Sequence, residues 1–156
     1  MKRADYVHQL PGLIPAMRQL LTVAETAGLE PLLLELVKIR ASQINGCAYC
    51  LDMHTKDAAA LGETQQRLAL VSVWSEAPGF TERERAALRW CESLTLLAAT
   101  GAPDSEFQPL AANFTEEEIV ALTLVVVSIN GWNRLAVGLR APVGDYQSQR
   151  QPAQPD

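Results

Sequence analysis

Apolar residues recur along this 156-residue chain mostly every three to four positions, as they do on one face of a helix. The every-second-residue pattern that is typical of strands is nearly absent. Residues 13–28 and 30–46 read as two helices. Gly28 would end the first, and Pro31 would lie in the first turn of the second, where proline is tolerated. A third helix is expected over residues 47–62 and a short fourth over residues 63–74.

Two capping-box spacings mark helix starts in the second half of the chain. In such a box, a threonine at the N-cap and a glutamate three residues later satisfy each other's backbone N–H groups. The pairs are Thr81 with Glu84 and Thr115 with Glu118. The first predicts a long helix to about Ala99. The second predicts a helix over residues 119–129, a Val- and Ile-rich run that would otherwise pass for a buried strand.

With a short helix over residues 104–112, these elements predict an all-α, single-domain bundle of about six to eight helices over residues 1–140. Ile-Asn-Gly occurs at 44–46 and again at 129–131, which suggests two related helix–turn–helix units. Residues 141–156 contain three prolines and lack apolar periodicity. We expect them to form a flexible tail or a strap over a neighbouring subunit.

Composition narrows the class of protein further. The net charge is −5 and the charges are scattered without a basic stripe, so nucleic acid is not an expected partner. The N-terminus lacks the apolar segment of a signal peptide, and the apolar runs are too short to span a bilayer. Three cysteines are too few for a disulfide framework. We therefore expect a cytoplasmic protein whose cysteines are reactive or bind metal.

Candidate chemistry gathers in the stretch INGCAYCLDMH, residues 44–54, which holds two of the three cysteines and one of the two histidines. On a helix, Cys47, Cys50 and His54 fall within an arc of about 60°. Asn45-Gly46 marks the helix start, so Cys47 would lie in the first turn, where free N–H groups favour a thiolate. Two cysteines at a helix start with a nearby base suit thiol–disulfide chemistry.

Glu35 is a further candidate for this site. Helical projection puts it beside Leu32, Leu36 and Ile39, on an otherwise apolar face. A buried carboxylate there needs a partner. His54 can be that partner if the Asn45-Gly46 turn folds the two helices against each other.

Interpretations in which the cysteines take no part in redox chemistry stay open. A structural zinc site could use both cysteines and His54, with Glu35, Cys91 or His8 as the fourth ligand. A c-type haem is excluded because Leu51, and not a histidine, follows the second cysteine. Cys91 is expected to be an inert core residue and His8 a solvated one.

Glu35, Cys47, Cys50 and His54 have the spacing E-x11-C-x2-C-x3-H. With it, residues 15–140 resemble alkylhydroperoxidase D-like proteins of the carboxymuconolactone decarboxylase superfamily. The resemblance implies an all-helical fold, assembly into homo-trimers or homo-hexamers, and a redox dithiol that reduces hydroperoxides without a metal or other cofactor. The reductant would be an external thiol or dithiol of unknown identity. Members that decarboxylate a lactone lack the cysteine pair, so that activity is disfavoured.

The resemblance also assigns roles within the site. Cys47 and Cys50 match the dithiol, and Glu35 with His54 match a proton relay. Cys50, one turn from His54, would attack the peroxide, and Cys47 would then form a disulfide with the oxidised Cys50. The helix dipole favours the opposite assignment, with Cys47 as the attacking thiol. Well-known members carry a histidine where this chain has Tyr49, which leaves the electron donor open. A zinc-stabilised module, a redox sensor with little turnover and a purely structural oligomer are the alternative functions.

Overall fold

A computed structural model describes residues 2–151, and over this range the secondary structure is helical without a strand. The α-helices are α1 (Tyr6–Gln9), α2 (Leu13–Glu25), α3 (Pro31–Ile44), α4 (Ala48–Ala60), α5 (Gln65–Leu70), α6 (Glu82–Thr95), α7 (Leu97–Thr100), α8 (Asp104–Asn113) and α9 (Glu116–Leu139), with a 3-10 turn, η1 (Val71–Val73), after α5. The predicted all-α fold is confirmed. The two four-residue helices, α1 and α7, are not expected from the sequence because they are too short to show a period.

Both predicted capping boxes are present. The Thr81 hydroxyl accepts a hydrogen bond from the Glu84 N–H at 3.2 Å, and the Glu84 carboxylate accepts one from the Thr81 N–H at 2.7 Å. Thr115 and Glu118 repeat the arrangement at the start of α9. The Val- and Ile-rich run is therefore helical, as expected. The helix that begins at Thr81 ends at Thr95 and not near Ala99, because the backbone leaves helical geometry at the next residue.

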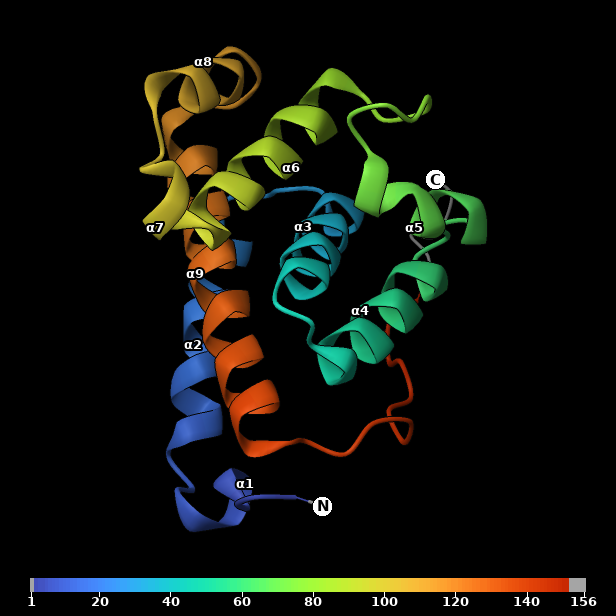
Figure 1. The fold of residues 1–156 in the computed structure, drawn as a ribbon, viewed down its shortest axis with the longest axis vertical. Coiled ribbons are helices and arrows are strands. Elements are labelled where there is room, and N and C mark those ends of the chain that lie inside the picture. Colours follow the sequence, from blue (N-terminus) through green and yellow to red (C-terminus); the bar gives the residue numbers. More distant parts are fainter. Residues whose placement is uncertain (1, 152–156) are drawn as a thin grey trace.

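Helix α3 lies at the centre of the molecule and contacts α4, α6 and α9 (Figure 1). Helix α2 runs beside α9 on one side, and α8 packs on α6 at one end. Most of α3 is buried, including polar side chains. This central position explains why α3 is apolar almost all round, and it brings Glu35 within reach of α4.

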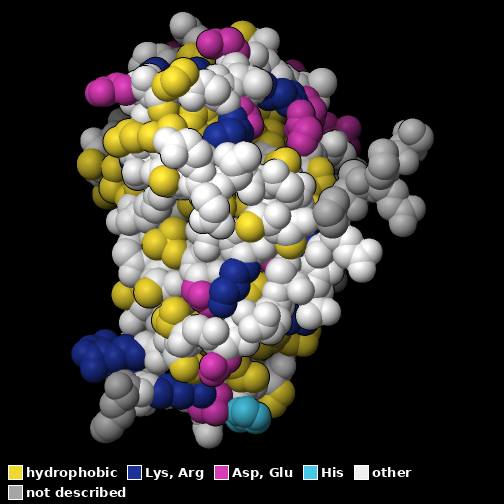
Figure 2. Space-filling model, turned by 90° about the vertical axis from the view of Figure 1, so that its right-hand side faces the viewer, with side chains coloured by type: hydrophobic (Ala, Val, Ile, Leu, Met, Phe, Trp, Pro, Cys, Tyr) yellow, Lys and Arg dark blue, Asp and Glu magenta, His cyan; other side chains and the backbone are white. Residues whose placement is uncertain are grey.

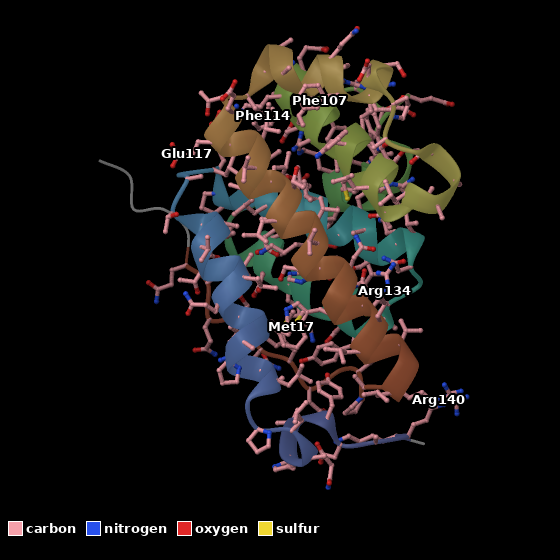
Figure 3. The ribbon with its side chains drawn as sticks, turned by 90° about the vertical axis from the view of Figure 1, so that its left-hand side faces the viewer. Met17, Phe107, Phe114, Glu117, Arg134 and Arg140 are labelled. Atoms are coloured by element: carbon pink, nitrogen blue, oxygen red, sulfur yellow. The ribbon has the colours of Figure 1, made fainter. Side chains whose placement is uncertain are left out.

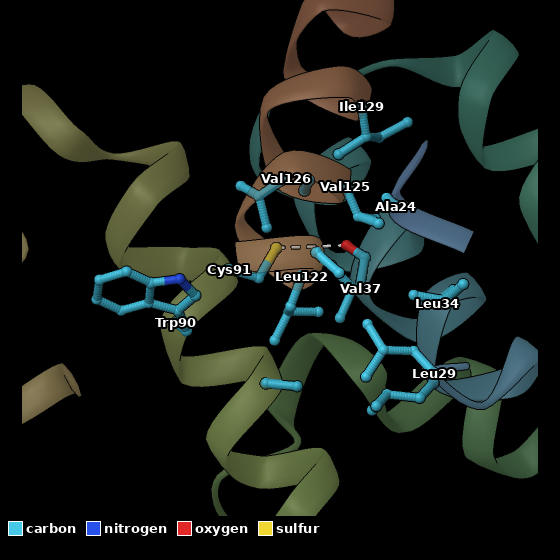
Figure 4. Packing of buried hydrophobic residues seen from close by; sticks show 14 of the residues in the cluster. Ala24, Leu29, Leu34, Val37, Trp90, Cys91, Leu122, Val125, Val126 and Ile129 are labelled. Atoms are coloured by element: carbon cyan, nitrogen blue, oxygen red, sulfur yellow. Dashed lines mark hydrogen bonds between the residues drawn. The ribbon is translucent and has the colours of Figure 1, made fainter. Parts of the chain in front are cut away.

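Cys91 is an ordinary core residue. Its side chain is completely buried in α6 and packs with Leu122 and Val126 of α9 (Figure 4). The thiol donates a hydrogen bond to the Val37 carbonyl at 3.3 Å. Burial raises its pKa to about 12, so it stays protonated at neutral pH. The prediction that Cys91 is a core residue is confirmed.

The two Ile-Asn-Gly copies are close in space but differ in structure. The first forms the predicted turn, with Gly46 at φ +64°. The second lies inside the uninterrupted helix α9, so the turn expected at residues 129–131 is wrong. Gly131 serves packing instead, since a Cβ there would lie 2.8 Å from the Met17 methyl group of α2 (Figure 3). Asn45 donates hydrogen bonds to Asn130 at 3.0 Å and to Asn133 at 2.9 Å, joining the turn to α9.

Helix α9 is longer than the apolar run in the sequence indicates. Among the described residues, it is long and apolar enough to cross a membrane by length and composition, with a mean hydropathy of 1.5 in its most apolar window. Here 44% of that window is buried, and the helix contacts α2, α3, α4 and α6. These contacts are those of a core helix.

The described part of the C-terminal segment lies along α4 of its own chain (Figure 1). The Tyr146 hydroxyl and the Ser148 hydroxyl both donate to Asp57 Oδ1, at 2.8 Å and 2.6 Å. Lys56 donates to the Tyr146 carbonyl at 3.0 Å. We call residues 144–150 the C-terminal strap. The expected flexible or subunit-strapping tail, 141–156, extends past residue 151 and so lies partly outside the described residues.

Charged side chains are dispersed over the face that carries α4 and α5. Figure 2 shows acidic and basic groups interspersed on this face, without a stripe of one sign. Ion pairs such as Lys56 with Asp52 at 2.9 Å and Arg67 with Glu84 at 2.6 Å account for part of this mixture. The surface on this side matches the scattered charge pattern of the sequence.

Candidate active site

Cys47 is the N-cap of α4, one residue before the helix begins. Its extended backbone points the side chain back over the first turn, where Sγ accepts a hydrogen bond from the Cys50 N–H at 3.3 Å. The pKa of Cys47 is lowered to about 7, chiefly because the Cys50 thiol also donates to it, and the backbone N–H groups and Asn133 add to the effect against the cost of burial. Cys47 therefore ionises more readily than an ordinary cysteine near neutral pH.

Cys50 has the opposite electrostatic setting. Its pKa is raised, because it donates to Cys47, because it is buried, and because the neighbouring thiolate repels a second negative charge. When Cys47 is ionised, the one remaining thiol proton therefore stays on Cys50, which donates it in a hydrogen bond to Cys47. Both side chains are 1% exposed.

His54 lies one turn after Cys50 on α4 and meets Glu35 of α3. His54 Nδ1 is 2.8 Å from Glu35 Oε2, and the Lys38 ammonium donates to Glu35 Oε1 at 2.7 Å. All three side chains are buried. The predicted pairing of Glu35 with His54 is therefore present, and Lys38 supplies a second partner that the sequence analysis did not identify.

The protonation states of this cluster follow from its contacts. Burial alone would raise the pKa of Glu35, but hydrogen bonds and charge from His54 and Lys38 lower it to about 2. Burial lowers the pKa of His54 despite the nearby carboxylate. His54 is then neutral, and because ionised Glu35 can only accept, Nδ1 carries the proton. This tautomer leaves His54 Nε2 free to accept a proton.

Two separate hollows reach the two cysteines. A cavity of about 320 Å³, which we call the main cavity, is lined by Cys50, His54 and mostly apolar side chains from α1, α2, α4 and α9. A smaller hollow of about 230 Å³ is lined by Cys47 together with Val137 and Arg140 at the end of α9. Cys50 and the base therefore face one space, and Cys47 faces another.

Asp57 and the C-terminal strap extend the buried polar cluster. Asp57 is 5% exposed, and its carboxylate accepts from Tyr146 and Ser148. Arg150 of the strap lies 3.7 Å from Glu35 Oε1. Sequence analysis missed these residues because their contacts join positions about 90 or more apart. Lys38 could have been found, since it stands three residues after a glutamate on the same helix.

The structure does not bring together the ligands that a structural zinc site would need. Among the described residues, the group of three or more potential metal ligands whose ligand atoms lie within 4.8 Å of one another is Glu35, His54 and Asp57, which includes no cysteine. Glu35 is already paired with Lys38. His8, proposed as a possible fourth ligand, is exposed and bonded to Asp5, which confirms the prediction that it is solvated.

Fold and site together define an all-helical protein with a buried Cys-x-x-C dithiol beside a glutamate–histidine pair. The chain belongs to the carboxymuconolactone decarboxylase family, whose sequence profile matches residues 11–93. This family assignment confirms the resemblance drawn from the sequence.

Individual relatives agree with that assignment. The uncharacterised protein YdfG of Bacillus subtilis (strain 168) is 35% identical over 138 residues, which span 88% of this chain and 94% of YdfG. The crystal structure of ATU0492 from Agrobacterium tumefaciens is 43% identical, with a TM-score of 0.89 over 94% of this chain and 100% of that one. ATU0492 is a protein of unknown function provisionally described as the antioxidant defence protein AhpD.

A more distant neighbour shares the fold only. The debrominase Bmp8 is 18% identical, with a TM-score of 0.76 over 89% of this chain and 75% of its own. A debrominase on this fold indicates that the fold alone does not determine the reaction.

Proposed function

We propose that the protein is a hydroperoxide reductase of the alkylhydroperoxidase D type, acting through the Cys47/Cys50 dithiol. The observation that carries the proposal is that Cys50 and His54 line one cavity while Glu35 holds His54 by its other nitrogen. A thiol and a correctly protonated base facing the same space are what attack on a peroxide needs. The description of ATU0492 as an antioxidant protein supports the same class of function.

The chemistry begins with Cys50. His54 Nε2 takes the Cys50 proton, and the resulting thiolate attacks the terminal oxygen of the hydroperoxide, breaking the O–O bond. The proton passes from His54 to the departing alkoxide. One thiol and one hydroperoxide thus become a sulfenic acid on Cys50 and an alcohol.

Cys47 completes the oxidation. Its thiolate attacks the Cys50 sulfenic sulfur, a disulfide forms, and hydroxide leaves and takes up a proton to give water. The dithiol has then supplied the two electrons that reduced the peroxide. An external dithiol restores it by exchange and becomes a disulfide itself. Cys47 is the sulfur that we expect this reductant to attack, since it lines the second hollow near the end of α9.

The lower pKa of Cys47 does not reverse these roles. A thiolate must also meet the peroxide, and the main cavity is lined by Cys50 and not by Cys47. The low pKa suits a resolving thiol, which has to be ionised when the sulfenic acid appears. We expect the working protein to be a cytoplasmic homo-oligomer, a trimer or a hexamer.

The test is consumption of cumene hydroperoxide with dithiothreitol as the reductant, with cumyl alcohol measured as the product. We expect multiple turnovers by the unaltered protein and none by Cys50→Ser. Cys91→Ser is the matched control and should keep full activity. Stoichiometric oxidation without turnover would favour a redox sensor, and peroxide loss that survives Cys50→Ser would contradict the proposal.

A further inference from the structure

The main cavity has an apolar body with a cation at its edge. Its lining includes Ile14, Leu21, Met53, Val125, Ile129 and Trp132, so most of the surface that a ligand would touch is apolar. At about 320 Å³ it lies at the small end of ligand cavities, which run from about 300 to 1,000 Å³. That volume suits a small organic molecule and not an intact membrane lipid.

Arg18 of α2 is the cation at this edge. It lines the same cavity as Cys50 and is exposed to solvent. The other cation on the cavity wall, Lys38, is neutralised by Glu35. Among residues 2–151, the Arg18 guanidinium takes part in none of the hydrogen bonds or ion pairs, whereas the Arg89 guanidinium, for example, pairs with Glu106.

The charge of Arg18 acts on a group inside the cavity wall. Burial raises the pKa of the Tyr49 hydroxyl, and the positive charge of Arg18 opposes that rise. Tyr49 lies next to Cys50 in the chain and lines the cavity as well. The guanidinium therefore influences the space in which the thiol would react, while its five N–H donors remain available to a ligand.

We propose that the substrate is a small hydroperoxide with an apolar or aromatic body and a carboxylate, which pairs with Arg18 while the peroxide reaches Cys50. This inference rests on the proposed function and names its substrate class. Guanidinium and carboxylate match in geometry and can form two parallel hydrogen bonds. The apolar lining would hold the body of the molecule between its two polar ends.

The experiment compares two hydroperoxides that differ only in the acid: cumene hydroperoxide and its para-carboxylate derivative. The unaltered protein should show a lower KM for the carboxylate. Arg18→Gln should raise that KM about threefold to tenfold with little change in kcat, because the lost contact is equal in the ground state and the transition state. The KM for cumene hydroperoxide should be the same in Arg18→Gln as in the unaltered protein.

Two further readouts separate a substrate contact from a structural effect. Arg18→Lys should keep part of the preference, and added salt should raise the KM of the carboxylate only, because exposed charges are screened. Arg89→Gln, an exposed arginine of α6 away from the cavity, is the matched control. Equal KM values for the two peroxides, or a preference that survives Arg18→Gln, would overturn the inference. Failure to consume either peroxide would instead overturn the proposed function.

Discussion

His54 Nδ1 and Glu35 Oε2 lie 2.8 Å apart in the interior, although the two residues are 19 positions apart in the chain. The turn at Gly46 makes this contact possible, because it folds α4 back against α3. The contact fixes the imidazole tautomer and leaves Nε2 free to accept a proton. The role that we assign to Glu35 is therefore electrostatic as well as positional.

Glu35→Gln tests that role. The amide keeps the shape but loses the charge that stabilises the imidazolium, so His54 becomes a weaker base. General-base assistance is typically worth about 10² to 10⁴ in rate. We expect at least a roughly tenfold fall in peroxide-dependent disulfide formation at neutral pH. His54→Asn should show a similar fall, and the double variant little further loss, because the two residues act as one relay.

Loss of the Glu35 charge also leaves the Lys38 ammonium buried without its partner, which can cost about 3–5 kcal/mol of stability. Lys38→Met in the Glu35→Gln background should restore the melting temperature without restoring the rate. Glu117→Gln, at an exposed position of α9, is the matched control. Full activity of Glu35→Gln at pH 7 would remove Glu35 from the relay.

The sequence predicts those parts of the fold and site that depend on neighbours in the chain. The capping boxes, the turn at Gly46 and the E-x11-C-x2-C-x3-H spacing are local signals, and each corresponds to observed geometry. The second Ile-Asn-Gly is different. Gly131 looks like a turn residue in the sequence, but its function is close packing against Met17, which becomes visible only once α2 is placed.

The site residues that escaped sequence analysis are held by long-range contacts. Asp57 carries no motif, and its partners Tyr146 and Ser148 stand in a segment without periodicity. Nothing local indicates that this segment returns to α4. The separate cavities of Cys47 and Cys50 are likewise a product of packing between α4 and α9.

The pKa of Cys47 gives a pH prediction. Because it is lowered from 9.0 to about 7, one thiolate should titrate near pH 7 by its ultraviolet absorbance. Cys47→Ser should abolish that step and Cys91→Ser should leave it unchanged. A group with a lowered pKa stabilises the folded state fully above its unfolded pKa. This contribution should therefore fall as the pH drops from about 9 through 7. A first thiolate that appears only above pH 9 would contradict the assignment.

The C-terminal strap should contribute to stability through Asp57. Hydrogen bonds to charged groups are worth about 1.5–3 kcal/mol. Tyr146→Phe removes one of the two donors to Asp57 Oδ1 and should lower the free energy of unfolding by about 1–2 kcal/mol in urea denaturation. Ser148→Ala should act similarly, and the double variant should deviate from additivity because the two share one acceptor. Unchanged midpoints for both variants would mean that the strap is not held in solution.

Oligomerisation is the third solution property to measure. Apolar side chains on α2 and α9 remain exposed in the single chain, among them Val23, Val120 and Val127. We expect light scattering to give three or six copies of the 17.0 kDa chain. Val127→Glu, which would bury a charge if α9 lies in the interface, should shift the mass downward, whereas Glu117→Gln should not. A monomer at micromolar concentration would contradict the expectation.

The central claim is that Cys47 and Cys50 form the redox pair, and intact mass with peptide mapping after one equivalent of cumene hydroperoxide tests it most directly. The account predicts the loss of two hydrogen atoms, a disulfide between Cys47 and Cys50, and Cys91 recovered as a free thiol. A dominant disulfide that includes Cys91, or three unchanged thiols after the peroxide, would contradict it.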